Sequence, residues 1–192
     1  MTVWGLRLSW HILRRFLRNT EDRRYLALAQ KWGKWAELRS YLSIFVLQGA
    51  LMLVISAPVI AIMTTDSPPL QLLTLLGAVV WLIGFYFEAV GDRQLTQFLQ
   101  NPHNKGKLMT TGLWRYTRHP NYFGEISQWW GIFVIALAVP YGLISIVGPL
   151  TVTILIVKVT GIPTVEANYK GRKDWQRYAA HTSKFLPLPP RR

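Results

Sequence analysis

The stretch that decides the fold reads ISQWWGIFVIALAVPYGLISIVGPLTVTILIV and runs from Ile126 to Val157 without a charged residue. A membrane-spanning helix needs only about 20 apolar residues to cross roughly 30 Å of hydrocarbon. Pro140-Tyr141-Gly142 interrupts the run near its middle. We therefore expect a hairpin of two spans. The alternative, one long tilted helix, would overshoot the bilayer by more than about 10 Å.

Two further uncharged runs precede this stretch, from Leu42 to Met63 and from Leu70 to Phe87. Pro58 is expected to kink the first run near its end, which a membrane helix tolerates. The sequence therefore predicts an all-α fold, an integral membrane bundle of about four transmembrane helices that forms a single membrane domain. The four predicted spans are 42–63, 70–90, 122–139 and 141–160.

The basic residues lie on one side of this arrangement. The chain has 192 residues and a formal net charge of +13, and all 22 Lys and Arg fall before Leu42, between Ala89 and Glu125, or from Lys158 onward. The positive-inside rule then places both termini in the cytoplasm, and we expect a bacterial inner-membrane protein. Anionic lipid headgroups explain the basic excess better than nucleic acid, which we do not expect as a partner. The cytoplasmic parts would be 1–41, a loop at 91–121, and a C-terminal segment at 161–192 that contains a helix.

The first forty residues carry an apolar stripe at helical spacing, at Trp4, Leu8, Ile12 and Phe16. An interfacial amphipathic helix is one interpretation. The other is a partial helix, the cytoplasmic end of a further span. The chain has no Cys, and its histidines at 11, 103 and 181 are isolated, so we expect no metal site.

The loop between the second and third spans indicates an anion site. Pro120 fits the first turn of the third span, and a helix N-terminus offers free N–H groups and partial positive charge. Arg118 and His119 flank that terminus, and Lys107 is close in sequence. The site could bind a ligand phosphate or carboxylate, or the cations could anchor the helix to lipid phosphates; the residues alone leave both open.

Carboxylates and aromatic residues add to the polar character of this side. Glu88 and Glu125 lie at the ends of the second and third spans, where a carboxylate is costly unless it pairs or functions. Either could form a salt bridge with Arg115 or Arg118, or contact a ligand. Trp175 and Tyr178, three residues apart on a basic helix, suit a membrane interface. Alternatively, their segment folds back over the loop and closes a cofactor cleft.

Several of these motifs together resemble the steroid 5-alpha-reductase-like membrane enzymes, particularly a bacterial branch of that family. The run from Gly112 to Glu125 is similar to the pattern G-L-W-x-x-T-R-H-P-N-Y-x-G followed by an acid. Further matches are F-E-x-x-x-D-x-Q-L at 87–95, T-G-I-P-x-x-E at 160–166, T-S-x-F-x-P-x-P-P at 182–190 and E-D-x-R-Y at 21–25. The resemblance covers nearly the whole chain.

The resemblance implies an NADPH-dependent reductase that transfers hydride to a carbon–carbon double bond of a lipophilic, steroid- or isoprenoid-like substrate. Members of the family carry further spans ahead of the segment that starts here near Trp4. Those spans supply much of the lipid pocket and the acid that polarises the substrate. In this chain Tyr122 or Tyr116 would serve as the acid, or a homo-oligomer or partner chain would complete the pocket. The implied cofactor-binding residues are Asp92, Gln94, Lys107, Trp114, Arg118, His119, Asn121, Tyr122, Glu125, Glu166 and Tyr169.

Two alternatives belong to other classes. The R-H-P-x-Y element and a late Glu followed by aromatic residues are also similar to isoprenylcysteine carboxyl methyltransferases, which use S-adenosylmethionine. Asn121, the Gly124-Glu125 pair and Trp129-Trp130 favour the reductase branch. The third interpretation is a non-catalytic lipid-binding membrane protein.

Overall fold

The computed structural model describes the chain except for residues 1, 3–4, 11–12, 14–32, 66–71 and 192. The chain divides into two compact units, Met1–Leu53 and Val54–Arg192, and each is described by itself. The described residues are all-helical apart from loops and one isolated bridge between Thr117 and Ser183. This agrees with the all-α class predicted from the sequence.

In the first unit, residues 5–10 are helical, but Trp4, Ile12 and Phe16 of the predicted amphipathic stripe lie outside the described residues, as does the 21–25 motif. A continuous helical run follows, and the last two residues of this run belong to the second unit. It comprises η1 (Gly33–Trp35), α3 (Ala36–Ser40), the π-helical η2 (Tyr41–Val46) and α4 (Leu47–Ile55).

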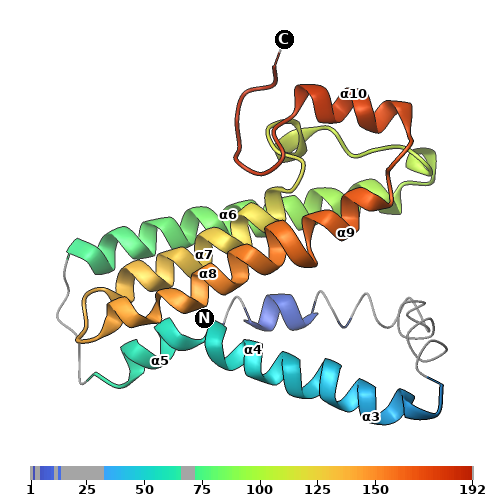
Figure 1. Cartoon of the computed structure of the whole chain (residues 1–192). Helices are drawn as coiled ribbons and strands as arrows, with labels where there is room; N and C mark the ends of the chain where they lie inside the picture. Colours follow the sequence, from blue (N-terminus) through green and yellow to red (C-terminus); the bar gives the residue numbers. More distant parts are fainter. Residues whose placement is uncertain (1, 3–4, 11–12, 14–32, 66–71, 192) are drawn as a thin grey trace. The chain divides into compact units, whose positions relative to one another are not determined.

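The second unit is built around α6 (Leu72–Gln100) and α7 (Pro120–Ala136), which run side by side in Figure 1. Glycines seven residues apart line the contact: Gly77 faces Gly131 and Gly84 faces Gly124, while Gly91 packs against Pro120 and Asn121 at the start of α7. A Cβ at Gly84 would lie 2.6 Å from the Gly124 oxygen, and one at Gly77 2.5 Å from the Gly131 oxygen. The two backbones are therefore in direct contact, as small residues permit between helices in a membrane.

The predicted hairpin is present. α7 ends at Ala136, Tyr141 takes a left-handed φ of 60°, and the buried Gly142 packs against the Ala136 oxygen. The chain then returns through η5 (Gly142–Ile146), α8 (Val147–Ile154) and the π-helical η6 (Leu155–Val159). Trp130 on α7 donates to the Thr153 hydroxyl at 3.2 Å, which fixes the returning helix alongside α7.

A small apolar core joins these helices. Ile126, Val152 and Ile156 are buried against one another. α5 (Ala57–Met63) adds the fully buried Pro58, whose ring packs against Gly148 on α8. Since proline lacks an N–H, the helix is interrupted at Ser56, and the predicted first span is divided between α4 and α5.

Two helical stretches among the described residues are long and apolar enough to cross a membrane, Leu72–Gln100 and Gly142–Ala167. They correspond to the second and fourth of the four predicted spans. The third is α7, which has 17 residues. α6 continues ten residues beyond the predicted boundary at Val90, because polar residues end an apolar run without ending a helix.

At one end of the second unit, the loop after α6 contains η3 (Pro102–Asn104) and η4 (Gly112–Arg115). After η6 come α9 (Ile162–Ala167) and α10 (Lys173–His181). Figure 1 shows α10 and the C-terminal segment lying beside the loop at this end. A cluster of polar side chains lies at the same end.

Candidate functional site

The C-terminal segment pairs with the chain just before α7. The Thr117 hydroxyl, fully buried, donates to the Phe185 oxygen at 2.8 Å, and the Arg118 N–H donates to the Ser183 oxygen at 2.9 Å. The Leu188 N–H donates to the Tyr116 oxygen at 3.0 Å. These bonds hold the segment before α7 in an extended form, and they fix the direction in which Arg118 and His119 leave the backbone.

Arg118 and His119 share one carboxylate oxygen. Glu166 on α9 places its Oε1 at 3.2 Å from Arg118 Nη1 and at 3.1 Å from His119 Nε2. The Arg118 side chain is 12% exposed, so its guanidinium is held inside the protein and does not simply reach toward lipid phosphates. Its Nε is buried and has no hydrogen-bond partner in the described part of the chain. One donor of the guanidinium fork is thus unused.

His119 is buried at the N-cap of α7, and its ring stacks on Tyr122 with 5.5 Å between centroids. Burial is the largest influence on His119 and lowers its pKa below 6.5; Arg118 and Lys184 lower it further, while Glu166 opposes them. The imidazole is therefore neutral near pH 7, and a neutral ring whose Nε2 carries the hydrogen donates to Glu166.

An aromatic group from the C-terminal part covers Arg118. The Arg118 guanidinium lies 5.4 Å from the centre of the Trp175 ring, a cation–π contact. Tyr169 stacks on Trp175 at 4.9 Å, and Tyr178 meets it edge-on at 5.7 Å. The Tyr178 hydroxyl donates to the Trp114 oxygen, and burial raises the pKa of Tyr178 well above its usual value. α10 is thus folded back over the loop, which agrees with that part of the second interpretation, while the cofactor cleft that it also expected stays a prediction.

On the α6 side, the predicted residue Asp92 binds the first turn of α7, and Gln94 binds the loop. Asn121 Nδ2 donates to Asp92 Oδ1 at 3.2 Å. Gln94 Oε1 accepts the Leu113 N–H at 3.0 Å, and Trp114 Nε1 donates to the Gly91 oxygen at 3.2 Å. These contacts attach the start of η4 and the first turn of α7 to the polar half of α6.

Most of the predicted site residues are therefore brought to one end of the second unit. They are linked by the contacts above: Asp92 with Asn121, Gln94 with the Trp114 loop, and Arg118 and His119 with Glu166, next to Tyr122 and Tyr169. Residues from α6, the loop, α7, α9 and the segment before α10 take part, although they span much of the sequence.

Three predicted residues lie apart from these contacts. Lys107 is exposed on the loop. Tyr116 is 44% exposed, with its backbone oxygen bound to the C-terminal segment. Glu125 is half-buried on α7. The sequence suggested Glu125 as a partner of Arg118, but Arg118 pairs with Glu166 instead. Helical geometry explains this, because Glu125 lies about one and a half turns along α7 from its first residue.

Three other groups make contacts that the sequence pattern did not indicate. Gln128 donates from Nε2 to the buried Glu88 within the α6–α7 contact, while its Oε1 has no partner in the described part of the chain. Trp175 covers Arg118, a role that its aromatic spacing did not indicate. Arg172 pairs with Asp174 and donates to the Gly106 oxygen at 2.7 Å, which attaches the loop tip to the start of α10. The contacts Gln128–Glu88, Trp175–Arg118 and Arg172–Gly106 each join residues far apart in the sequence, so no local pattern predicts them.

No group of three or more His, Cys, Asp or Glu side chains gathers to hold a metal ion within the described ranges. Over the described residues, fold and site define an all-helical protein with two membrane-length helices and a largely buried Arg–His–Glu cluster at one end of its larger unit. The chain belongs to the family described as "Protein of unknown function (DUF1295)", whose model matches residues 1–182. No match was found among curated proteins or among solved structures.

Proposed function

We propose that the protein is a membrane-embedded, NADPH-dependent reductase that transfers hydride to a carbon–carbon double bond of a lipophilic, steroid- or isoprenoid-like substrate. The observation that carries the proposal is Arg118, a guanidinium held at the N-terminus of α7 with its buried Nε unpaired. A planar guanidinium that keeps an unused donor is suited to bind a phosphate group. The resemblance of the surrounding motifs to the steroid 5-alpha-reductase-like enzymes supports the choice of NADPH.

The proposed topology has four spans in the bacterial inner membrane. Two of the spans would be α6 and the helical stretch that begins at Gly142. The other two would be α7 and the run of α4 and α5. Seventeen residues of α7 extend about 25 Å, which spans a thin hydrocarbon layer or one that Leu137–Val139 completes. The loop after α6 and α10 would face the cytoplasm, because they carry Lys and Arg while the turn around Tyr141 carries none.

The residues present fit the proposed cofactor. Arg118 would hold a phosphate at the N-terminus of α7, and Trp175 would keep the guanidinium in place. Bound NADPH supplies a hydride. The product also needs one proton, and Tyr122, stacked on the neutral His119, is the better placed of the two proposed acids, because Tyr116 is 44% exposed. The phenol would give its proton to the carbon that does not receive hydride and regain one from solvent.

An S-adenosylmethionine-dependent methyltransferase is the second candidate. The same Arg118 could bind the carboxylate of S-adenosylmethionine, since carboxylate and phosphate both match the guanidinium fork. A non-catalytic lipid-binding protein would keep the Arg118–Glu166 pair as a purely structural link.

Thermal stabilisation of the purified protein in detergent separates these candidates. We expect NADPH to raise Tm more than NADH or S-adenosylmethionine, because the 2′-phosphate adds charge that basic side chains can bind. A ligand at about 100 times its Kd adds roughly 2.7 kcal/mol. Stabilisation by S-adenosylmethionine alone would replace the reductase with the methyltransferase, and no stabilisation by any of the three would favour the non-catalytic protein.

A further inference from the structure

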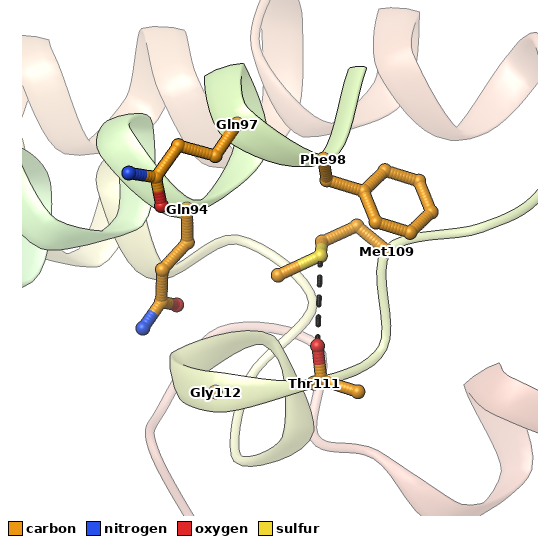
Figure 2. Close-up of a pocket in the computed structure, with 6 residues that line it drawn as sticks. All are labelled: Gln94, Gln97, Phe98, Met109, Thr111 and Gly112. Atoms are coloured by element: carbon orange, nitrogen blue, oxygen red, sulfur yellow. Dashed lines mark hydrogen bonds between the residues drawn. The ribbon is translucent and has the colours of Figure 1, made fainter. Parts of the chain in front are cut away.

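An open hollow of about 340 Å³ lies between the last turns of α6 and the loop that precedes η4. Figure 2 shows Gln94 and Gln97 on one side of it and the Phe98 ring near the Met109 thioether on the other. Thr111 and Gly112 complete the lining. The volume is at the lower end of ligand sites, which suits one ring system rather than a whole cofactor.

The hollow offers polar groups that the fold does not use. The exposed Gln97 side chain makes no hydrogen bond within the part of the chain that the structure describes, so both its amide oxygen and its amide nitrogen are available. Gln94 accepts the Leu113 N–H through Oε1, and its Nε2 remains as a donor. The loop comes this close only because residue 112 is glycine: φ is 63°, and a Cβ there would lie 2.6 Å from the Gln94 amide.

The lining selects a planar, uncharged group with donors and acceptors along its edge. Phe98 and Met109 give flat, polarisable apolar surface, on which a heterocyclic base can stack. None of the six lining residues carries a charge, so a phosphate has no counter-ion there. A glutamine amide pairs with adenine in a bidentate manner, since it accepts from the N6 amine and donates to N7.

We propose that this hollow binds the adenine base of an adenosine-containing cofactor, with Gln97 reading the base edge and Phe98 supporting its face. Gln97 follows Asp92 on α6 by five residues, a rise of about 7.5 Å, so the hollow lies one to two turns from the residues that reach the α7 N-terminus. The inference rests on the proposed function only in requiring such a cofactor. NADPH and S-adenosylmethionine both carry adenosine, so it does not depend on the choice between them.

The test compares two nucleotides that differ at one position of the base. AMP carries an amine at C6, and IMP carries an oxygen there, which leaves Gln97 with one hydrogen bond fewer. Dissociation constants of AMP and IMP are measured by NMR titration of the protein in detergent micelles. We expect AMP to bind roughly five- to hundredfold more tightly than IMP.

Three variants assign that preference to the hollow. Gln97→Leu should weaken AMP binding by a similar factor and remove the difference between AMP and IMP. Phe98→Leu should weaken both nucleotides alike. Gln100→Leu is the matched control, an exposed glutamine one turn further along α6 that does not line the hollow, and it should bind as the wild type does.

Equal binding of AMP and IMP by the wild type, or an unchanged AMP preference in Gln97→Leu, would overturn the adenine site. NADPH titrations of the same proteins keep this result separate from the proposed function. NADPH that binds wild type and Gln97→Leu equally would overturn the site and leave the reductase intact. A wild type that prefers AMP through Gln97 but is not stabilised by NADPH would support the site and count against the reductase.

Discussion

At the scale of single residues, Arg118 combines three roles that the sequence could not separate. It pairs with Glu166, lies over Trp175, and keeps an unpaired Nε. A lysine could keep the charge at this position, but it has neither the planar fork nor the surface that stacks on an indole. The internal contacts and the proposed phosphate contact can therefore be tested with one substitution.

Arg118→Lys should weaken NADPH binding about ten- to hundredfold, the equivalent of losing one charge-assisted contact of roughly 1.5–3 kcal/mol. It should also lower the free energy of unfolding by up to about 1 kcal/mol, because a lysine ammonium cannot stack on the Trp175 ring as the planar guanidinium does. Titration and thermal melts measure the two effects. Arg115→Lys, an exposed neighbour, is the control and should change neither. Wild-type NADPH affinity in Arg118→Lys would eliminate the phosphate assignment.

His119 should make stability depend on pH in a defined direction. Burial holds its pKa below 6.5 in the folded protein, so in that range the unfolded chain binds a proton that the folded protein does not. The free energy of unfolding should therefore fall as pH drops below about 6.5 toward the folded pKa, and His119 should contribute no pH dependence above that range. Melts of the wild type and His119→Asn from pH 5 to 8 test this.

The difference between those two proteins isolates the imidazole from other titrating groups. His119→Asn should lose the fall below about pH 6.5, whereas His103→Asn, at an exposed loop position, should keep it. Parallel pH profiles in wild type and His119→Asn would show that burial does not control this histidine.

At the scale of helices, the contact of α6 with α7 depends on the absence of side chains. Gly84→Ala would place a methyl group 2.6 Å from the Gly124 oxygen, which is backbone and cannot move aside cheaply. We expect a loss of about 1–3 kcal/mol or a lower yield of folded protein. Gly49→Ala on α4 is the control, since nothing lies within 4 Å of the added Cβ, and its higher helix propensity should raise stability by up to about 1 kcal/mol.

Thermal melts in detergent measure both variants. Equal behaviour of Gly84→Ala and Gly49→Ala would mean that the two helices are not in backbone contact.

The helices also show what a single sequence can and cannot predict. The hairpin at Pro140–Gly142 was predictable, because bilayer thickness limits how long one uncharged helix can be. The end of α6 was not, since the charges after Val90 end the apolar run without ending the helix. The attachment of the C-terminal segment to Thr117 left no periodic signal, because it joins two extended stretches through backbone groups.

The candidate site also has features that the sequence could predict and features that it could not. The cluster of basic residues at the α7 N-terminus was predictable from the loop sequence. That Glu166, and not Glu125, pairs with Arg118 was not, because the partner comes from a helix that follows the hairpin. The resemblance placed both glutamates in the site without saying which one meets the arginine.

At the scale of the whole molecule, the chain without cysteine suits accessibility labelling of its topology. Tyr141→Cys introduces a thiol in the turn between α7 and α8, where the Tyr141 side chain is 84% exposed. Lys105→Cys introduces one at an exposed position of the loop after α6. An impermeant maleimide should label Tyr141→Cys in intact cells, and it should label Lys105→Cys only after permeabilisation. The reverse pattern would invert the proposed orientation, and equal labelling of both would deny that α7 crosses the membrane.

The attachment of Thr117 also determines when the site can form during synthesis. The acceptor of its hydroxyl, the Phe185 oxygen, lies 68 residues further along the chain. At about 5–20 residues per second, the ribosome needs on the order of 3–14 s to make that stretch, long enough for α7 and the returning helix to leave the ribosome first. The Arg118 cluster is therefore completed last, so the nascent chain acquires its helices before it can hold a ligand.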